Sequence, residues 1–173
     1  MQKGHLVKLA LDALKKRLAD NDNVIEIYSG EGYVSPAVFT FNLPISPQEL
    51  NEFIDTFGIE LPIDYKNFLL MHNGAELFKH PEYGGEFHLY DLAAIEDCFV
   101  DEDWPKHWLP VAYHYGEEII IDLTRVAHGM DNYLIWRGCC APLEESVDMG
   151  MSFEQRLDRS LICQGVNFWQ WSI

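Results

Sequence analysis

The chain is 173 residues long, and 48% of its residues are hydrophobic and 13% aromatic. A chain of this length and composition can bury a core without disulfides or a metal, and it is too rich in large apolar residues to be disordered. Its 28 acidic and 12 basic residues give a net charge of −16. A field of this sign repels phosphate backbones and anionic lipids, which argues against direct binding of nucleic acid or a membrane surface.

The charged residues are unevenly distributed along the chain. Five basic residues and one acid occur between Lys3 and Arg17, whereas Leu18 to Tyr65 contains no Lys or Arg. The stretch from His80 to Pro105 also lacks Lys and Arg and contains eight acids. Outside Lys3 to Arg17 the chain has seven basic and 27 acidic residues, a net charge of −20. Such a surface attracts cationic partners and speeds their encounter, although in many acidic proteins the charge only maintains solubility.

No segment has the pattern of a signal peptide or a membrane span, because the first apolar stretch, Leu6 to Leu18, is interrupted by charged residues. The cysteines form no C-x-x-C pair and suit neither a disulfide framework nor a zinc knuckle. We therefore expect a cytoplasmic protein in which four thiols are reduced and buried, namely Cys98, Cys139, Cys140 and Cys163.

One helix and two strands are predicted in the first 43 residues. His5–Ala19 has the apolar spacing of an amphipathic helix. Val24–Ser29 alternates as a strand, and Ala37–Leu43 is expected to be a second strand that ends at Pro44. The buried face of the helix is predicted to consist of Leu6, Leu9, Ala10, Ala13 and Leu14.

Two short helices are predicted next. Ser46 is a favourable N-cap, Pro47 suits the first helical position, and Glu49 completes a capping box. Gly58 is a natural C-terminal stop. A third helix opens at Leu61-Pro62 and is expected to stop at Asn73-Gly74. Its apolar side is predicted to contain Tyr65, Phe68, Leu69 and His72.

After Gly74 the pattern changes to strands, which are predicted at Glu86–Tyr90, Trp108–Tyr113, Glu118–Leu123 and Asn132–Arg137. Leu92–Phe99 is expected to be a short helix or a turn. Ser152 caps a last helix that runs to about Cys163, and the aromatic tail from Gln164 is expected to pack as an edge strand or an extended arm. This order predicts an α+β fold with a mostly antiparallel sheet, and the lack of a linker predicts a single domain over residues 1–173.

The sequence offers no arrangement that favours catalysis or metal binding. It lacks a G-x-S-x-G nucleophile motif, and the acidic neighbours of Cys98 make its thiolate scarce. The histidines form no H-x-x-x-H or H-E-x-x-H pair, and Asp101-Glu102-Asp103 lacks the alternating ligands and the Gly of a calcium loop. We therefore expect no catalytic residue, no metal and no cofactor.

The remaining candidate is a protein-binding surface. Carboxylates at residues 101–103 precede the large aromatic residues Trp104 and Trp108, and charged rims around aromatic anchors are typical of protein interfaces. The alternative is a solvated loop whose tryptophans fill the core. The residues predicted to contact a partner are Glu96, Asp97, Asp101, Glu102, Asp103, Trp104, Tyr115, Glu117 and Glu118.

Residues 61–75, LPIDYKNFLLMHNGA, resemble the signature helix of the SUKH superfamily, which has the pattern L-P-x-D/E-Y/L-K/R-x-F/L-L followed by N-G-G or N-G-A. Further on, FHLYDL at 87–92 is similar to the family's L-Y-x-L strand, and LPVA at 109–112 to its I-P-I-A strand. SFEQRL at 152–157 resembles the closing S-F-x-x-F/W-L helix. The likeness covers about residues 46–161.

One segment departs from the family pattern. Many relatives have a Gly/Asp-rich turn after the I-P-I-A strand, whereas residues 113–118 of this chain are YHYGEE. The hairpin can still form there, but any partner contact at this turn must differ from that of the relatives.

The resemblance implies an α+β fold without an active site and two roles: bacterial immunity proteins that neutralise polymorphic toxins, and fungal regulators of cell-wall assembly. Together with the charge, it leads to the hypothesis of a non-enzymatic immunity protein that binds a cationic toxin domain, such as a nuclease. The alternative is a regulatory scaffold protein in cell-envelope or stress control.

Overall fold

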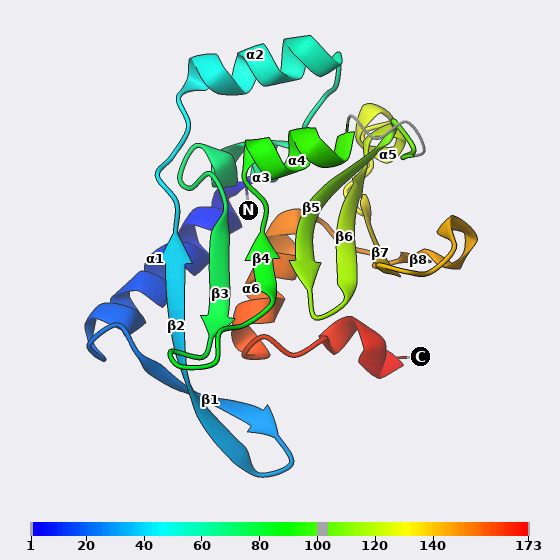
Figure 1. Cartoon of the computed structure of the whole chain (residues 1–173). Helices are drawn as coiled ribbons and strands as arrows, with labels where there is room; N and C mark the ends of the chain where they lie inside the picture. The colour runs from blue at the N-terminus through cyan, green and yellow to red at the C-terminus, as the bar shows by residue number, and fades with distance from the viewer. Residues whose placement is uncertain (1, 100–103, 173) are drawn as a thin grey trace.

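One antiparallel sheet organises the computed structural model, which describes residues 2–99 and 104–172 (Figure 1). Each of its eight described strands pairs with the next one along the chain. The sheet confirms the predicted antiparallel arrangement. The strands are β1 (Ile25–Gly30), β2 (Tyr33–Phe41), β3 (Ala75–Lys79), β4 (Phe87–Leu89), β5 (Trp108–His114), β6 (Glu117–Asp122), β7 (Leu134–Gly138) and β8 (Val147–Asp148).

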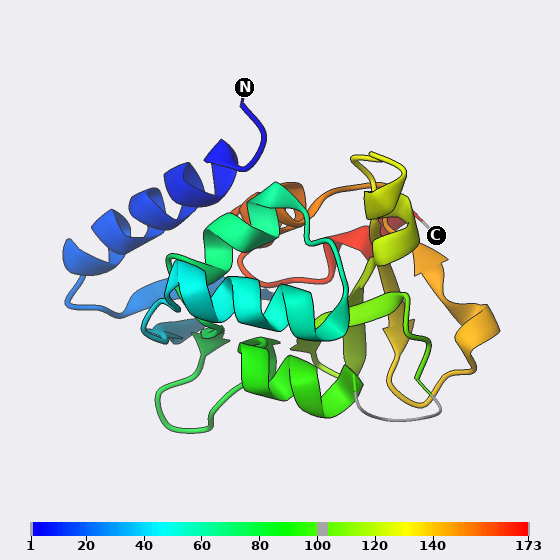
Figure 2. The same cartoon turned by 90° about the horizontal axis from the view of Figure 1, so that it is seen from above.

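Helices cover both faces of this sheet and one of its ends. Seen from above in Figure 2, α1 and α6 lie on one side of the sheet and α4 lies on the other, while α2 crosses the upper end. This arrangement confirms the predicted α+β fold. The helices of the described residues are α1 (His5–Ala19), α2 (Pro47–Phe57), α3 (Ile63–Leu69), α4 (Leu92–Phe99), α5 (Leu123–Ala127) and α6 (Phe153–Ile162), with 3₁₀ turns η1 (Leu143–Glu145) and η2 (Phe168–Ser172).

The predicted helix caps are confirmed. Ser46 accepts a hydrogen bond from the Glu49 N–H, and the Glu49 carboxylate accepts one from the Ser46 N–H, which is a complete capping box at α2. Gly58 ends the helix with a φ of 61°, a left-handed conformation that glycine adopts without steric cost. Ser152 and Gln155 form a second capping box at α6.

The buried face of α1 differs from the prediction. Ala10 and Leu14 are buried as predicted, but Leu9 is 45% exposed and Ala13 is exposed. Val7, Leu11 and Leu18 complete the buried face instead. Both sets have helical spacing, so periodicity alone cannot choose between them. The choice is made by packing, because α1 contacts both α3 and α6 and therefore turns the stripe with the larger side chains inward.

Several elements differ from the prediction because their signals are not local. Strand β2 begins four residues earlier than predicted, at Tyr33, since its first residues pair with β1 in a hairpin that extends past the rest of the sheet (Figure 1). Strands β3 and β8 and helix α5 were not predicted from the sequence. His72 lies beyond the end of α3 and is half-buried, with its ring against the Asn42 carbonyl at 2.9 Å and the Lys15 amine at 2.6 Å.

The tail and the thiols also depart from expectation. Residues 168–172 form the 3₁₀ turn η2, not a strand, because Trp169 turns inward and is 8% exposed. None of the four cysteines is in a disulfide, as expected, but Cys139 and Cys140 are exposed and the other two are only half-buried, so the prediction of buried thiols was wrong. Among the described residues, no helix is long and apolar enough to cross a membrane.

The Asp64 carboxylate joins three parts of the fold. It is 3% exposed and accepts hydrogen bonds from the Tyr133 hydroxyl at 2.5 Å and from the Glu154 N–H at 2.9 Å. The Tyr133 hydroxyl in turn accepts the Phe153 N–H at 3.0 Å, and Ser152 accepts the Gln155 N–H. The first three N–H groups of α6, which have no partner within a helix, are therefore all paired.

A second buried cluster lies under the C-terminal tail. The Glu117 carboxylate accepts hydrogen bonds from the indole N–H of Trp169 at 3.0 Å and from the amide of Asn167 at 3.2 Å. The Arg156 guanidinium is fully buried, 5.0 Å from the Phe87 ring and 5.2 Å from the Trp169 ring. The tail is thus fixed by one carboxylate and by stacking on a buried cation.

The imidazole of His114 belongs to the same cluster and has no exposed surface. Burial, with the nearby charge of Arg156, lowers the pKa of His114 to about 3, although the Gly165 carbonyl favours the charged ring. Burial raises the pKa of Glu117, while its contacts with Trp169, Arg156 and Gln170 oppose that rise. The histidine is therefore neutral at physiological pH.

Replacing Asp64 by alanine is expected to lower the free energy of unfolding by about 3 kcal/mol, because two buried donors lose a charged acceptor. Tyr133→Phe keeps the carboxylate and should cost about 1–2 kcal/mol. Urea denaturation of the full chain measures both changes. Asp131→Ala is the matched control, because Asp131 contacts Lys3 with a side chain that is 75% exposed. Equal midpoints for Asp64→Ala and Asp131→Ala would contradict the assigned role of Asp64.

The pKa of His114 predicts acid sensitivity. As the pH falls from about 6.5 toward 3, the unfolded chain binds a proton that folded His114 does not, so this residue should reduce stability by about 1.4 kcal/mol per pH unit. Glu117 has the opposite sign, because its raised pKa favours the folded state as the pH falls. Chemical denaturation of the wild type and of His114→Phe between about pH 7 and 4 measures this effect, because this range lies mostly between the pKa of His114 in the unfolded and in the folded chain. The variant should show the flatter profile, and parallel profiles would refute this assignment.

Candidate functional site

The candidate site is a groove between α2 and α4 whose ionisable residues are all acidic. Its volume is about 260 Å³. Phe53, Phe57 and Leu92 provide an apolar floor, and Phe57 packs edge-on against Phe99 of α4 with ring centroids 5.2 Å apart. Its rim carries the carboxylates of Glu49, Glu52 and Glu96. We call this feature the α2–α4 acidic groove.

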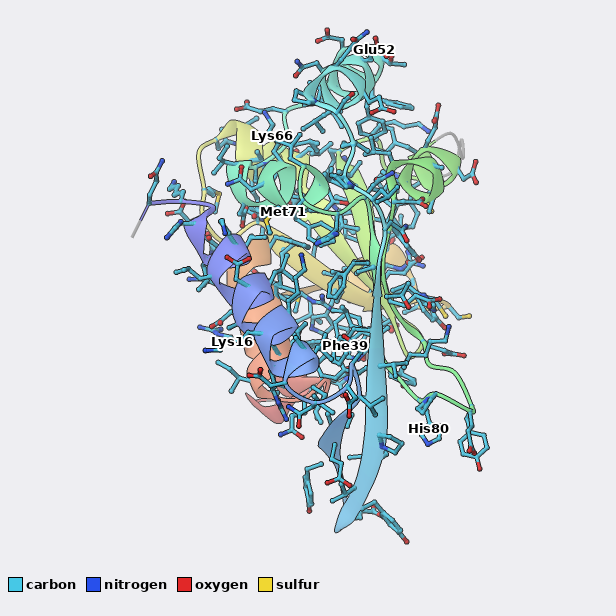
Figure 3. All side chains as sticks on the ribbon, turned by 90° about the vertical axis from the view of Figure 1, so that its left-hand side faces the viewer. Lys16, Phe39, Glu52, Lys66, Met71 and His80 are labelled. Carbon is cyan, nitrogen blue, oxygen red and sulfur yellow. The ribbon has the colours of Figure 1, made fainter. Side chains whose placement is uncertain are left out.

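The two helices that form this groove have no basic residue to neutralise it. Helix α2 also carries Asp55 and helix α4 carries Asp97, and both are exposed. Figure 3 shows Glu52 on the outer side of α2, away from the sheet. Hydrogen bonds from Ser46 hold the pKa of Glu49 below its usual value, so this carboxylate stays charged at neutral pH. An apolar floor inside a rim of one sign can bind a cationic, partly apolar surface.

The structure brings only some of the predicted contact residues to this groove. Glu96 lines it, and Asp97 is its exposed neighbour on α4. The acidic run of residues 101–103 lies outside the described residues. The prediction did not include Glu49 and Glu52, which line the groove, or Asp55, which is exposed on α2. They belong to a stretch that contains no basic residue, but nothing in the sequence places α2 beside α4.

Trp104 and Glu118 meet through an arginine. The Arg137 guanidinium lies 5.4 Å from the Trp104 ring, and its Nε is 3.1 Å from the Glu118 carboxylate. Trp104 also donates its indole N–H to the Trp108 carbonyl at 2.6 Å. Burial raises the pKa of Glu118, and the charge of Arg137 opposes that rise. These two predicted residues are half-buried and already paired with Arg137, so only part of each side chain is open to a partner.

Glu117 and Tyr115 lie elsewhere. The Glu117 carboxylate is 8% exposed and is engaged with the tail, so it is not available to a partner in this structure. The sequence could not show this, because Glu117 and Glu118 look alike but point to opposite faces of β6. Tyr115 is 56% exposed at the β5–β6 turn, which is the end of the sheet opposite to α2 (Figure 1).

A cavity of about 390 Å³, larger than the α2–α4 acidic groove, lies beside the signature helix α3. The cavity is lined by residues of both charges, namely Lys3, Lys66, Glu60 and Asp131. Asp64 also lines it, but its carboxylate is already hydrogen-bonded within the chain. Among the described residues, no group of three or more His, Cys, Asp or Glu side chains could hold a metal ion. Arg156 and His114 have no exposed surface and therefore cannot touch a substrate. The α2–α4 acidic groove remains the better candidate.

Comparison with known proteins gives the family. The model of the SMI1 / KNR4 family (SUKH-1) matches residues 44–159, which include α2, α3, α4 and most of α6. The uncharacterized protein YnaB of Bacillus subtilis (strain 168) is 28% identical over 134 residues, 78% of this chain and 88% of its own length. The uncharacterized protein YobM of the same organism is 28% identical over 167 residues, 90% of this chain and 87% of its own length. The chain therefore belongs to the SMI1 / KNR4 family (SUKH-1).

Proposed function

We propose that this protein is a non-enzymatic binding domain that acts as an immunity protein, and that it neutralises a cationic toxin through the α2–α4 acidic groove. The observation that carries the proposal is the groove itself, which has an apolar floor and a rim of carboxylates without a basic residue. The family supports it, since its members are generally non-enzymatic and associate with proteins. A nuclease is a suitable target class, because enzymes that act on nucleic acid present cationic surfaces to their substrate.

The charge distribution supports an oriented encounter. Helix α1 carries Lys8, Lys16 and Arg17 on its exposed side and lies across the sheet from α4 (Figure 2). A cationic partner is therefore attracted to the α2–α4 face and repelled by α1. Exposed charges act over about one Debye length, roughly 8 Å at physiological ionic strength, so this effect belongs mainly to the association rate and weakens with salt.

The direct test of the proposal is co-expression of the full chain with the toxin domain encoded beside its gene. A neighbouring gene for a secreted protein with a C-terminal toxin domain, together with protection of the host cell and co-purification of the two proteins, is the expected result. A regulatory scaffold would instead co-purify with envelope or stress proteins and give no protection against a toxin. That outcome would overturn the immunity role.

Replacing exposed acids of α2 and α4 by neutral residues should slow association with the toxin. The variant combines Glu52→Gln, Asp55→Asn, Glu96→Gln and Asp97→Asn, which are exposed, and it leaves the capping residue Glu49 in place. We expect an association rate constant about tenfold lower at low salt and a flatter dependence on ionic strength. Stopped-flow or surface plasmon resonance measurements with the toxin domain give both quantities.

A matched control removes the same number of exposed acids elsewhere. It combines Asp20→Asn, Asp22→Asn, Glu144→Gln and Glu145→Gln, at the end of α1 and in η1. The control should retain most of the association rate, because those charges lie outside the groove. An equal loss in both variants would show that net charge alone steers the partner and that the groove is not the docking site.

A further inference from the structure

Large apolar side chains are exposed at the end of the sheet opposite to α2. Their exposed fractions are 55% for Tyr28, 70% for Tyr33, 59% for Val34, 84% for Tyr83 and 56% for Tyr115. They come from the β1–β2 hairpin, the β3–β4 connection and the β5–β6 turn, which all lie at the lower end in Figure 1. We call this set the tyrosine end. Clusters of exposed apolar side chains on a soluble domain mark interaction sites more often than single ones do.

A groove of about 240 Å³ joins the segments that carry these residues. The groove is lined by Ile27 and Ser35 of the β1–β2 hairpin, Gly84 of the β3–β4 connection, Tyr115 of the β5–β6 turn and Gly165 of the tail. The three connections are therefore neighbours in space and not only in projection. The groove is a depression beside the exposed Tyr115 ring into which a side chain of a partner can enter.

Contacts within the chain order part of the tyrosine end before any partner binds. The backbone N–H of Tyr115 donates to the Glu86 carbonyl at 3.1 Å, which fixes the β5–β6 turn against the β3–β4 connection. Tyr83 stacks on His80 with ring centroids 4.5 Å apart, and the His80 ring accepts the N–H groups of Glu82 and Tyr83. Side chains that are already ordered lose less entropy on binding.

Most of the charged residues around the tyrosine end are acidic. Glu26, Glu31, Glu82 and Glu86 are all exposed on the segments that carry the rings. Lys79 is nearby, but its amine is paired with Glu76 at 2.8 Å. Arg17 reaches the outer edge of β1, where it contacts the Glu26 carbonyl at 3.5 Å. The end thus combines aromatic faces with carboxylates, and a cationic group complements both.

We propose that the tyrosine end is a second docking surface, which binds an arginine-rich segment of a protein partner. Arginine fits better than lysine, because its planar guanidinium stacks on a ring and pairs with a carboxylate at the same time. The chain already uses this arrangement internally, where Arg137 lies between the Trp104 ring and the Glu118 carboxylate. At the tyrosine end the rings and the acids are present and the arginine comes from outside.

This surface is distinct from the α2–α4 acidic groove. Strand β5 runs seven residues between the two ends of the sheet, which is roughly 20 Å at the usual rise per residue. Figure 3 shows the same separation, with Glu52 of α2 at one end and His80 of the β3–β4 connection near the other. In the groove Phe53 is buried and Phe57 half-buried, whereas the tyrosine rings of this end are exposed, so the two surfaces should differ in their preference for arginine over lysine.

The test uses the full ¹⁵N-labelled chain and two probe peptides, deca-arginine and deca-lysine, titrated separately and followed by NMR. Amides of the β1–β2 hairpin, of residues 82–86 and of Tyr115 should shift with deca-arginine, and deca-lysine should bind there about tenfold more weakly. At the α2–α4 acidic groove the two peptides should bind with similar affinity. The groove is thus an internal control whose failure is separate from failure here.

The variant Tyr33→Ser with Tyr83→Ser should weaken the arginine-peptide response at this end about tenfold and leave the groove response unchanged. Leu43→Ser with Ile63→Ser, also at exposed apolar positions, is the control and should change neither. Equal responses to arginine and lysine at this end would overturn the proposal. So would concentration-dependent broadening of these amides without peptide, because that would assign the surface to a second copy of the chain.

Discussion

The fold depends on one buried carboxylate, that of Asp64. A charge in this position is expensive to desolvate unless hydrogen bonds compensate it, and here the compensation comes from Tyr133 and from the N-terminus of α6. The positive end of the α6 dipole favours the charge further. Glu154, the residue whose N–H Asp64 accepts, uses its own side chain to bind the Leu6 N–H of α1 at 3.0 Å. Helices α1, α3 and α6 are thus joined through two adjacent contacts.

This connection gives a physical reason for two motifs of the family pattern. The acid of the L-P-x-D helix, Asp64, and the start of the closing S-F helix are about 90 residues apart in the sequence. They are in contact because the Asp64 carboxylate accepts a hydrogen bond from the Glu154 N–H in the first turn of α6. Helix α6 then brings Arg156 under the sheet, where the cation stacks on Phe87 and on Trp169. The tail is consequently held by a residue whose position is set by Asp64. The two proposed binding surfaces lie at opposite ends of the sheet that this layer supports.

Local signals in the sequence were sufficient for the elements that carry their own caps. The boundaries of α2 and α6 follow from Ser46, Gly58 and Ser152, since capping is satisfied within a few residues. Features that depend on distant partners were not predictable in this way. The inward turn of Trp169 requires Glu117, and the acidity of the groove requires α2 to lie beside α4. The exposure of an acid was therefore predicted less well than its location in a helix or strand.

The two proposed surfaces differ in how they relate to the family. The α2–α4 acidic groove is built wholly within the matched residues 44–159, on helices that the shared core positions. Most of the tyrosine end comes from the β1–β2 hairpin, which precedes that segment, and one wall of its groove comes from the tail, which follows it. The exposed side chains of this hairpin, such as Tyr28, Tyr33 and Val34, can change without disturbing Asp64 or the core. If both proposals hold, the scaffold keeps a cationic-partner site on the matched segment while the segments outside it set a second preference, so that affinity and selectivity are determined by different parts of one chain.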